Sequence, residues 1–150
     1  MKVTFKKGLP GLDEYKDYEI KEIEDGEEFK LLQCNEKKEL GLVIISPFQV
    51  EKEYEIKITD EIIKNLSITS PEDVLVYSTV TLNSDPKKIT ANLRAPILIN
   101  VHTGLAEQLI TENEKYKIKH PIFKGWFYVS SYKKTRWVNF NWGWYRNFSF

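Results

Sequence analysis

Short stretches of apolar residues, often alternating with polar ones, follow one another along the first 122 residues. β-branched and aromatic side chains dominate these stretches, and turn-forming residues separate them, which is typical of β-strands. The stretches that we predict to be strands are residues 18–23, 29–34, 40–46, 54–58, 74–82, 89–93, 96–101 and 105–110. The pattern predicts a mainly β fold, a compact antiparallel β-barrel-like domain.

Turn chemistry indicates where several of these strands end. Residues 24–27 carry an Asp-Gly pair that favours a hairpin, and Pro47 cannot donate to a strand ladder. Asn92 and Pro96 predict a break between two strands, because asparagine ties a turn through its own side chain. Residues 8–11, Gly-Leu-Pro-Gly, predict a tight turn and not a phosphate loop, since no Lys-Ser/Thr pair and no helix follows.

Helix signals are brief. Thr59 is a good N-cap for a helix over residues 60–65, and the two acidic residues that follow it favour the positive end of the helix dipole. Ser70 and Pro71 resemble a second helix start, but the strand at Val74 follows at once, so we expect a single turn there. The fold should therefore carry one or two short helices.

The last 28 residues differ from the rest in charge and in aromatic content. Residues 1–122 hold 17 basic and all 22 acidic side chains, a net charge of −5, whereas residues 123–150 hold five basic ones. Twelve of the 20 aromatic residues, including all four tryptophans, also lie in this second part. We divide the chain into a β domain, residues 1–122, and a basic aromatic C-terminal extension, residues 123–150. Because Val138, Phe140 and Trp142 have strand spacing, we expect the extension to pack on the domain.

Groups with chemical reactivity are few. Cys34 is the one cysteine, so the chain has no internal disulfide, and His102 and His120 do not form a zinc-binding pattern with it. No nucleophile motif such as G-x-S-x-G is present. We therefore predict no enzymatic activity, no cofactor and no metal site.

The hydropathy of the chain indicates where it resides. Its mean hydropathy is −0.43, and no apolar run reaches the length that spans a membrane. Residues 1–7 lack the apolar segment of a signal peptide. We expect a soluble, cytoplasmic and monomeric protein.

Several short motifs follow one another between residues 5 and 121. They are Gly8-Leu9-Pro10-Gly11-Leu12, Leu31-Leu32-Gln33, Gly41-Leu42-Val43-Ile44 with Ser46-Pro47-Phe48, Ile68-Thr69-Ser70-Pro71-Glu72-Asp73-Val74, Thr90-Ala91-Asn92-Leu93-Arg94-Ala95-Pro96-Ile97-Leu98-Ile99-Asn100 and Tyr116-Lys117-Ile118-Lys119-His120-Pro121. In this order and spacing the chain resembles the FliW family of flagellar assembly factors.

The resemblance implies a β-barrel-like cytoplasmic protein without catalysis or cofactor. Such proteins bind flagellin, and they bind the RNA-binding translational repressor CsrA, which relieves repression of flagellin synthesis. Two features of this chain depart from the family pattern. Family members usually carry one further strand before the Gly-Leu-Pro-Gly turn, where only residues 1–7 stand here, and their tails are usually short and polar, unlike residues 123–150.

Two surfaces are candidates for partner binding. The acidic domain suits a basic partner such as CsrA, because opposite charges raise the rate of encounter. Flagellin instead requires exposed apolar contacts that receive a helical segment. The predicted partner-binding residues are Glu22, Glu24, Asp25, Glu27 and Glu28 in the acidic hairpin, and Phe48, Val50 and Tyr54 beside the Pro47 break.

The alternative function is binding of nucleic acid or of a membrane surface through the extension. Its basic residues could meet phosphates while its tryptophans stack on bases. The acidic domain would repel such polyanions, so we expect neither direct nucleic-acid binding nor membrane binding.

Overall fold

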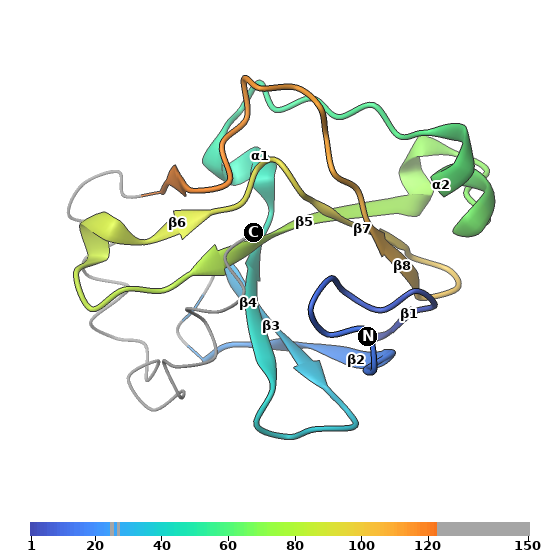
Figure 1. The fold of residues 1–150 in the computed structure, drawn as a ribbon, viewed down its shortest axis with the longest axis horizontal. Helices are drawn as coiled ribbons and strands as arrows, with labels where there is room; N and C mark the ends of the chain where they lie inside the picture. The colour runs from blue at the N-terminus through green and yellow to red at the C-terminus, as the bar shows by residue number, and fades with distance from the viewer. Residues whose placement is uncertain (25, 27, 123–150) are drawn as a thin grey trace.

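The computed structural model describes residues 1–24, 26 and 28–122, and in this part of the chain seven strands close into a barrel (Figure 1). The barrel strands are β1 (Lys2–Phe5), β2 (Asp17–Glu22), β3 (Phe29–Cys34), β4 (Gly41–Ile45), β5 (Val74–Thr81), β7 (Ile97–Asn100) and β8 (Leu105–Gln108). Two further short strands, β6 (Thr90–Ala91) and β9 (His120–Pro121), lie outside the barrel. The helices are α1 (Pro47–Val50) and α2 (Asp60–Asn65), with one-turn 3₁₀ helices η1 (Pro71–Asp73) and η2 (Pro86–Lys88). The predicted mainly β, barrel-like fold with two short helices is confirmed.

The barrel closes because β5 pairs with strands on both of its sides. The order around the barrel is β4-β3-β2-β1-β8-β7-β5, and β5 meets β4 again where Ile44 faces Thr79. Beyond this junction β5 continues to pair with β6, and β6 pairs with β9, so a small sheet extends from one side of the barrel (Figure 1). β5 thus has neighbours on both sides, although full burial covers only residues 78–80 within it.

The strand that seemed to be lacking before the Gly-Leu-Pro-Gly turn is present. Residues 2–5 form β1, which pairs antiparallel with β2 and parallel with β8, where Thr4 faces Leu105. This is the one parallel pairing among the described strands; all others are antiparallel. Val3 and Phe5 are buried, so these few residues supply both the hydrogen bonds and the apolar face that a barrel strand needs.

The segment after β4 differs from the prediction. Pro47 ends the strand, as expected, but it also starts α1, because its fixed φ suits the first turn of a helix. Residues 54–58, predicted to be a strand, are irregular, since Tyr54 and Ile56 pack against the core without a neighbouring strand to pair with. The helix α2 has its predicted bounds, and the Thr59 side chain accepts a hydrogen bond from the Ile62 amide.

Three apolar clusters hold the elements together. The largest lies inside the barrel, a second lies under α1 and the small sheet, and a third lies under α2. Representative buried members are Phe5, Tyr18, Leu32, Ile44 and Ile97 in the first, Phe29, Ile45, Val80, Leu93 and Tyr116 in the second, and Ile62, Leu66, Leu98 and Leu109 in the third. Complete burial of such side chains contributes about 1.5–3 kcal/mol each.

Two of the predicted turns are described and have clear causes, whereas the turn at residues 24–27 includes Asp25 and Glu27, which lie outside the described residues. Gly8 has φ +69°, and a Cβ there would lie 2.7 Å from the Asp13 Cα, so only glycine fits. Between β6 and β7 the Asn92 Oδ1 accepts hydrogen bonds from the amides of Arg94 (3.0 Å) and Ala95 (3.1 Å). The expected strand break at Asn92 is therefore confirmed.

Candidate partner-binding surfaces

Phe48 is the exposed member of the predicted apolar surface. It lies on α1, 47% of its surface is accessible, and its ring packs edge-on against Tyr54 with the centroids 5.7 Å apart. A half-exposed aromatic ring supported from below by a second ring is a rigid apolar contact that a partner can bury.

Val50 and Tyr54 do not belong to that surface. Each has only 3% of its surface accessible, because both point into the cluster under α1. The Tyr54 hydroxyl donates to the Leu93 carbonyl (2.7 Å), and its ring contacts Tyr116 at 4.6 Å. Burial raises the pKa of Tyr54 well above its ordinary value. The prediction that these two side chains are exposed for binding is wrong; the Tyr54 ring instead packs against the ring of Phe48.

A shallow polar groove with a volume of about 360 Å³ also borders Tyr54. Two cations and two carboxylates line it, from Lys52, Glu53, Glu55 and Lys115. The Glu55 amide donates to the Tyr116 hydroxyl (2.8 Å), which ties the groove to the buried tyrosine pair. Polar groups beside an apolar contact are the arrangement of a binding-surface rim.

The predicted acidic hairpin is described only in part. Glu22 at the end of β2 is exposed and pairs with Lys30 across the strands, and Glu24 is also exposed. Glu28 is half-buried and already has an interaction partner. Asp25 and Glu27 lie outside the described residues. The structure thus places two of the five carboxylates at an accessible position.

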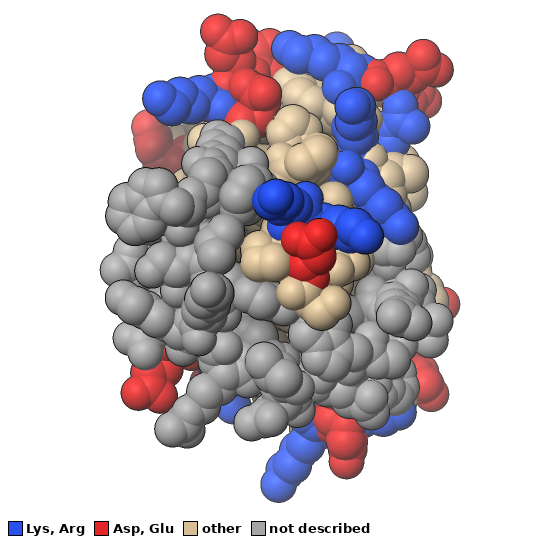
Figure 2. Space-filling view, turned by 90° about the vertical axis from the view of Figure 1, so that its left-hand side faces the viewer, with Lys and Arg blue, Asp and Glu red and all other residues tan. Residues whose placement is uncertain are grey.

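Described side chains of both signs are seen on one face of the molecule. Figure 2 shows both basic and acidic ones there, with several basic ones toward its upper right. The net charge of −5 for residues 1–122 is therefore not evenly spread, and local regions of positive sign exist on an acidic domain.

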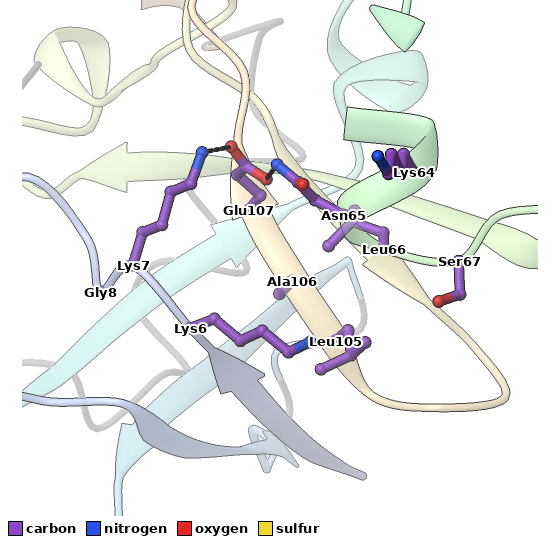
Figure 3. A pocket seen from close by; sticks show the side chains of 10 residues that line it. All are labelled: Lys6, Lys7, Gly8, Lys64, Asn65, Leu66, Ser67, Leu105, Ala106 and Glu107. Atoms are coloured by element: carbon purple, nitrogen blue, oxygen red, sulfur yellow. Dashed lines mark hydrogen bonds and ion pairs between the residues drawn. The ribbon is translucent and has the colours of Figure 1, made fainter. Parts of the chain in front are cut away.

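A pocket elsewhere on the molecule, which we call the lysine pocket, is lined by three lysines (Figure 3). It has a volume of about 310 Å³ and lies between the end of β1, the end of α2 and strand β8. The polar and charged side chains lining it are Lys6, Lys7, Lys64, Asn65, Ser67 and Glu107. Sequence reasoning did not find it, because its walls come from three segments that are distant in the sequence.

One hydrogen-bonded bridge crosses the lysine pocket. The Lys7 ammonium donates to Oε1 of Glu107 (3.1 Å), and the Asn65 side chain donates to Oε2 (3.2 Å), as Figure 3 shows. The hydrogen bond and charge of Glu107 raise the pKa of Lys7. Glu107 is only 17% exposed, so its carboxylate is largely enclosed by these partners.

Cys34 and His102, the potentially reactive side chains named above, are a buried core residue and a hydrogen-bonded surface residue, respectively. Cys34 is buried in the apolar cluster inside the barrel. His102 is exposed and lies 2.9 Å from Oδ1 of Asp73, whose other oxygen accepts from Thr69 and Ser70. Hydrogen bonds, first that from the Thr69 hydroxyl, lower the pKa of Asp73. Within the described ranges, no three His, Cys, Asp or Glu side chains are grouped as a metal ion would require.

Comparison with known proteins decides the family. A sequence profile described as "FliW protein" matches residues 1–122. The chain belongs to the FliW family. Flagellar assembly factor FliW of Clostridium botulinum strain Okra is 48% identical over 122 residues, covering 81% of this chain and 85% of the relative. That of Clostridium tetani strain Massachusetts is 49% identical, covering 81% and 84%.

A solved structure agrees with this FliW assignment. The crystal structure of a flagellar assembly factor FliW matches with a TM-score of 0.77 and 39% identity, covering 82% of this chain and 86% of that one. The resemblance noted in the short motifs is thus confirmed as family membership. The profile match ends at residue 122, where the predicted extension begins.

Two expectations concern the parts of the chain that these FliW comparisons leave open. We predict that residues 123–150 pack on the domain, and the alternative is that they form an arm that binds nucleic acid or membrane. These residues lie outside the described residues, so both statements stay predictions. In the described part, no helix has the length and apolar character needed to cross a membrane.

Proposed function

We propose that this FliW-family protein binds flagellin and CsrA in the cytoplasm and that it relieves CsrA repression of flagellin synthesis. The observation that carries the proposal is the family match over residues 1–122, which covers the whole described barrel. Binding of two proteins needs specific surfaces and no reactive group. We therefore assign it no catalytic step and no cofactor.

Calorimetry with the purified full-length chain tests this proposal directly. Heat of binding with flagellin, with CsrA or with both at tens of micromolar supports it. If the folded protein binds neither, the functional assignment fails while the fold and family stand.

For flagellin we assign the contact to Phe48. The exposed ring offers apolar area for a helical segment, and the Tyr54 ring beneath it limits the entropy lost when a partner fixes it. Phe48→Ala should weaken flagellin binding by about tenfold or more, as truncation of a central aromatic contact does. Ile110→Ala is the matched control, since Ile110 is an exposed apolar side chain elsewhere, with 68% of its surface accessible. Equal effects of both variants would remove Phe48 from this role.

For CsrA we assign long-range attraction to the acidic hairpin. Glu22 and Glu24 are exposed at the end of β2, where they add to the negative charge of the domain. Replacing both by lysine should slow association with CsrA mainly at low salt, because at 0.15 M ionic strength such fields reach only about 8 Å. The exposed pair Glu112 and Glu114, replaced in the same way, is the control. An association rate at low salt that is the same for both double variants would exclude a specific contribution of the hairpin.

A further inference from the structure

We propose that the lysine pocket is a binding site for an acidic side chain, with its apolar neighbour, on a segment of a protein partner. The inference rests on the proposed function, because it takes this protein to act by binding other proteins. It adds a site that neither the aromatic surface at Phe48 nor the acidic hairpin includes.

The charge of the pocket is opposite to that of the domain around it. Three lysines and one carboxylate line the pocket, and that carboxylate is already used, since Glu107 accepts from Lys7 with one oxygen and from Asn65 with the other. Lys7 also lies 3.6 Å from a carboxylate oxygen of Glu61 on α2. Lys6 and Lys64 have no carboxylate oxygen within 4.0 Å in the described part of the chain. Two cations from different elements are therefore available to a ligand anion.

The end of α2 would ordinarily repel an anion, because the last carbonyls of a helix carry partial negative charge. Here most of those carbonyls accept hydrogen bonds within the protein, that of Ile62 from the Leu66 amide (2.9 Å) and that of Lys64 from the Ser67 amide (3.1 Å). The Asn100 side chain donates to the carbonyls of Leu66 (2.8 Å) and Ser67 (3.2 Å), and the Ile63 carbonyl accepts from the Ile68 amide (2.9 Å). The lysine ammonium groups at the pocket wall are therefore offset by few unpaired backbone carbonyls.

The pocket also has an apolar part. Leu66 and Ala106 are buried beneath it, and Leu105 is half-buried at its edge, toward which the Lys6 side chain extends (Figure 3). A ligand that fills the volume of about 310 Å³ must combine an anionic group with hydrocarbon. A glutamate or aspartate beside an apolar residue meets both requirements, whereas a bare phosphate meets only the first.

The walls are held in place before any ligand arrives. Gly8 at the rim has a φ that favours glycine, and Ser67 on the opposite wall also has a positive φ, +54°, held by the Asn100 contact. The Lys7–Glu107–Asn65 bridge fixes the distance between β1, β8 and α2. Pre-organisation of this kind reduces the entropy that binding has to overcome.

A peptide titration of the full-length protein tests the site independently of flagellin and CsrA. The probe is acetyl-Leu-Glu-Leu-amide, with acetyl-Leu-Gln-Leu-amide as the neutral isostere and inorganic phosphate as the bare anion. We expect the glutamate peptide at millimolar concentration to shift the NMR amide signals of Gly8, Ser67 and Ala106, and the glutamine peptide to leave them unchanged. Equal shifts with both peptides, shifts with phosphate alone, or no shift would each overturn the proposal.

Charge reversal identifies the lysines involved. The double variant Lys6→Glu with Lys64→Glu should bind the glutamate peptide about tenfold more weakly. In this variant two partly exposed attractions between lysine and glutamate are each replaced by a repulsion. The control is Lys87→Glu with Lys88→Glu, two exposed lysines on η2, which should change the affinity by less than about twofold. Unchanged melting temperatures show that both variants fold. If the control variant loses as much affinity for the glutamate peptide as the pocket variant, the loss reflects the change in net charge alone, and the proposed site is refuted.

The same variants separate this inference from the proposed function. If the wild-type chain binds flagellin or CsrA and the pocket variant binds that partner about tenfold more weakly, both proposals gain support. If the wild-type chain binds a partner and the pocket variant binds it equally well, the assignment of the pocket to a partner contact fails alone. If the wild-type chain binds neither partner, the proposed function fails. The peptide titration then still tests whether the lysine pocket binds an acidic side chain.

Discussion

Replacing Asn100 by leucine should destabilise the protein more than any exposed asparagine could. The Asn100 side chain is 1% exposed and connects the end of β7 with the end of α2. Its Nδ2 donates to the carbonyls of Leu66 (2.8 Å) and Ser67 (3.2 Å), and its Oδ1 accepts from the amides of His102 (2.8 Å) and Thr103 (3.4 Å). Leucine has a similar size but can make none of these bonds.

The expected loss follows from those contacts. Three of the four are 3.2 Å or shorter, and a typical hydrogen bond contributes about 0.5–1.5 kcal/mol. The free energy of unfolding should therefore fall by about 3 kcal/mol, out of the 5–15 kcal/mol that is usual for a domain. For a protein of this size each kcal/mol lowers the melting temperature by about 2–4 °C, so a drop of about 6–12 °C is expected.

Urea unfolding followed by far-ultraviolet circular dichroism measures this loss. Asn113→Leu is the control, because Asn113 is exposed and its side-chain oxygen accepts from the Lys115 amide (3.0 Å) in a local turn. The control should lose less than about 1 kcal/mol. If Asn100→Leu loses as little as the control, the buried asparagine does not hold α2 to the barrel, and the rigid wall argued for the lysine pocket is refuted as well.

Three further predictions concern other positions. Gly104→Ala should lower the melting temperature sharply, because Gly104 has φ +74° and a Cβ would lie 2.5 Å from a β1 carbonyl oxygen. Tyr54→Phe should lower the free energy of unfolding, measured with urea, by about 1 kcal/mol, because the 2.7 Å hydrogen bond to the Leu93 carbonyl is lost. Hydrogen bonds, first from Thr69, hold the Asp73 pKa below its ordinary 3.8, so its stabilisation is complete above that pH and is lost as pH falls through the lowered value. Asp73→Asn should therefore flatten the acid limb of a stability–pH curve, and an unchanged limb would contradict this.

Local signals carried most of the fold prediction. The bounds of β3 and α2 agree with the predicted ones, because an apolar strand bounded by turn residues and a helix with a threonine cap are each specified by neighbouring residues. Residues 54–58 also alternate, yet none of the described strands pairs with them, so the alternation reflects packing of Tyr54 and not pairing. Pairing is a tertiary property that a single segment does not encode.

The surfaces were harder to predict than the fold for a related reason. Phe48 and Tyr54 are six residues apart and both aromatic, but only the packing of α1 decides that one is exposed and the other buried. The lysine pocket depends on Lys7 and Glu107, which are 100 positions apart and meet only once β1 and β8 are adjacent. A pocket assembled by topology leaves no pattern in the sequence.

The parallel pairing of β1 with β8 also constrains how the chain folds. The antiparallel strands β1 to β4 can form one after another, because each pairs with the next strand along the chain. The contact between Thr4 and Leu105 instead requires a loop of about 100 residues to close, and such non-local contacts slow folding, typically into the millisecond-to-second range. During synthesis on the ribosome, the open edge of β1 must therefore wait until β8 has emerged before the barrel can close.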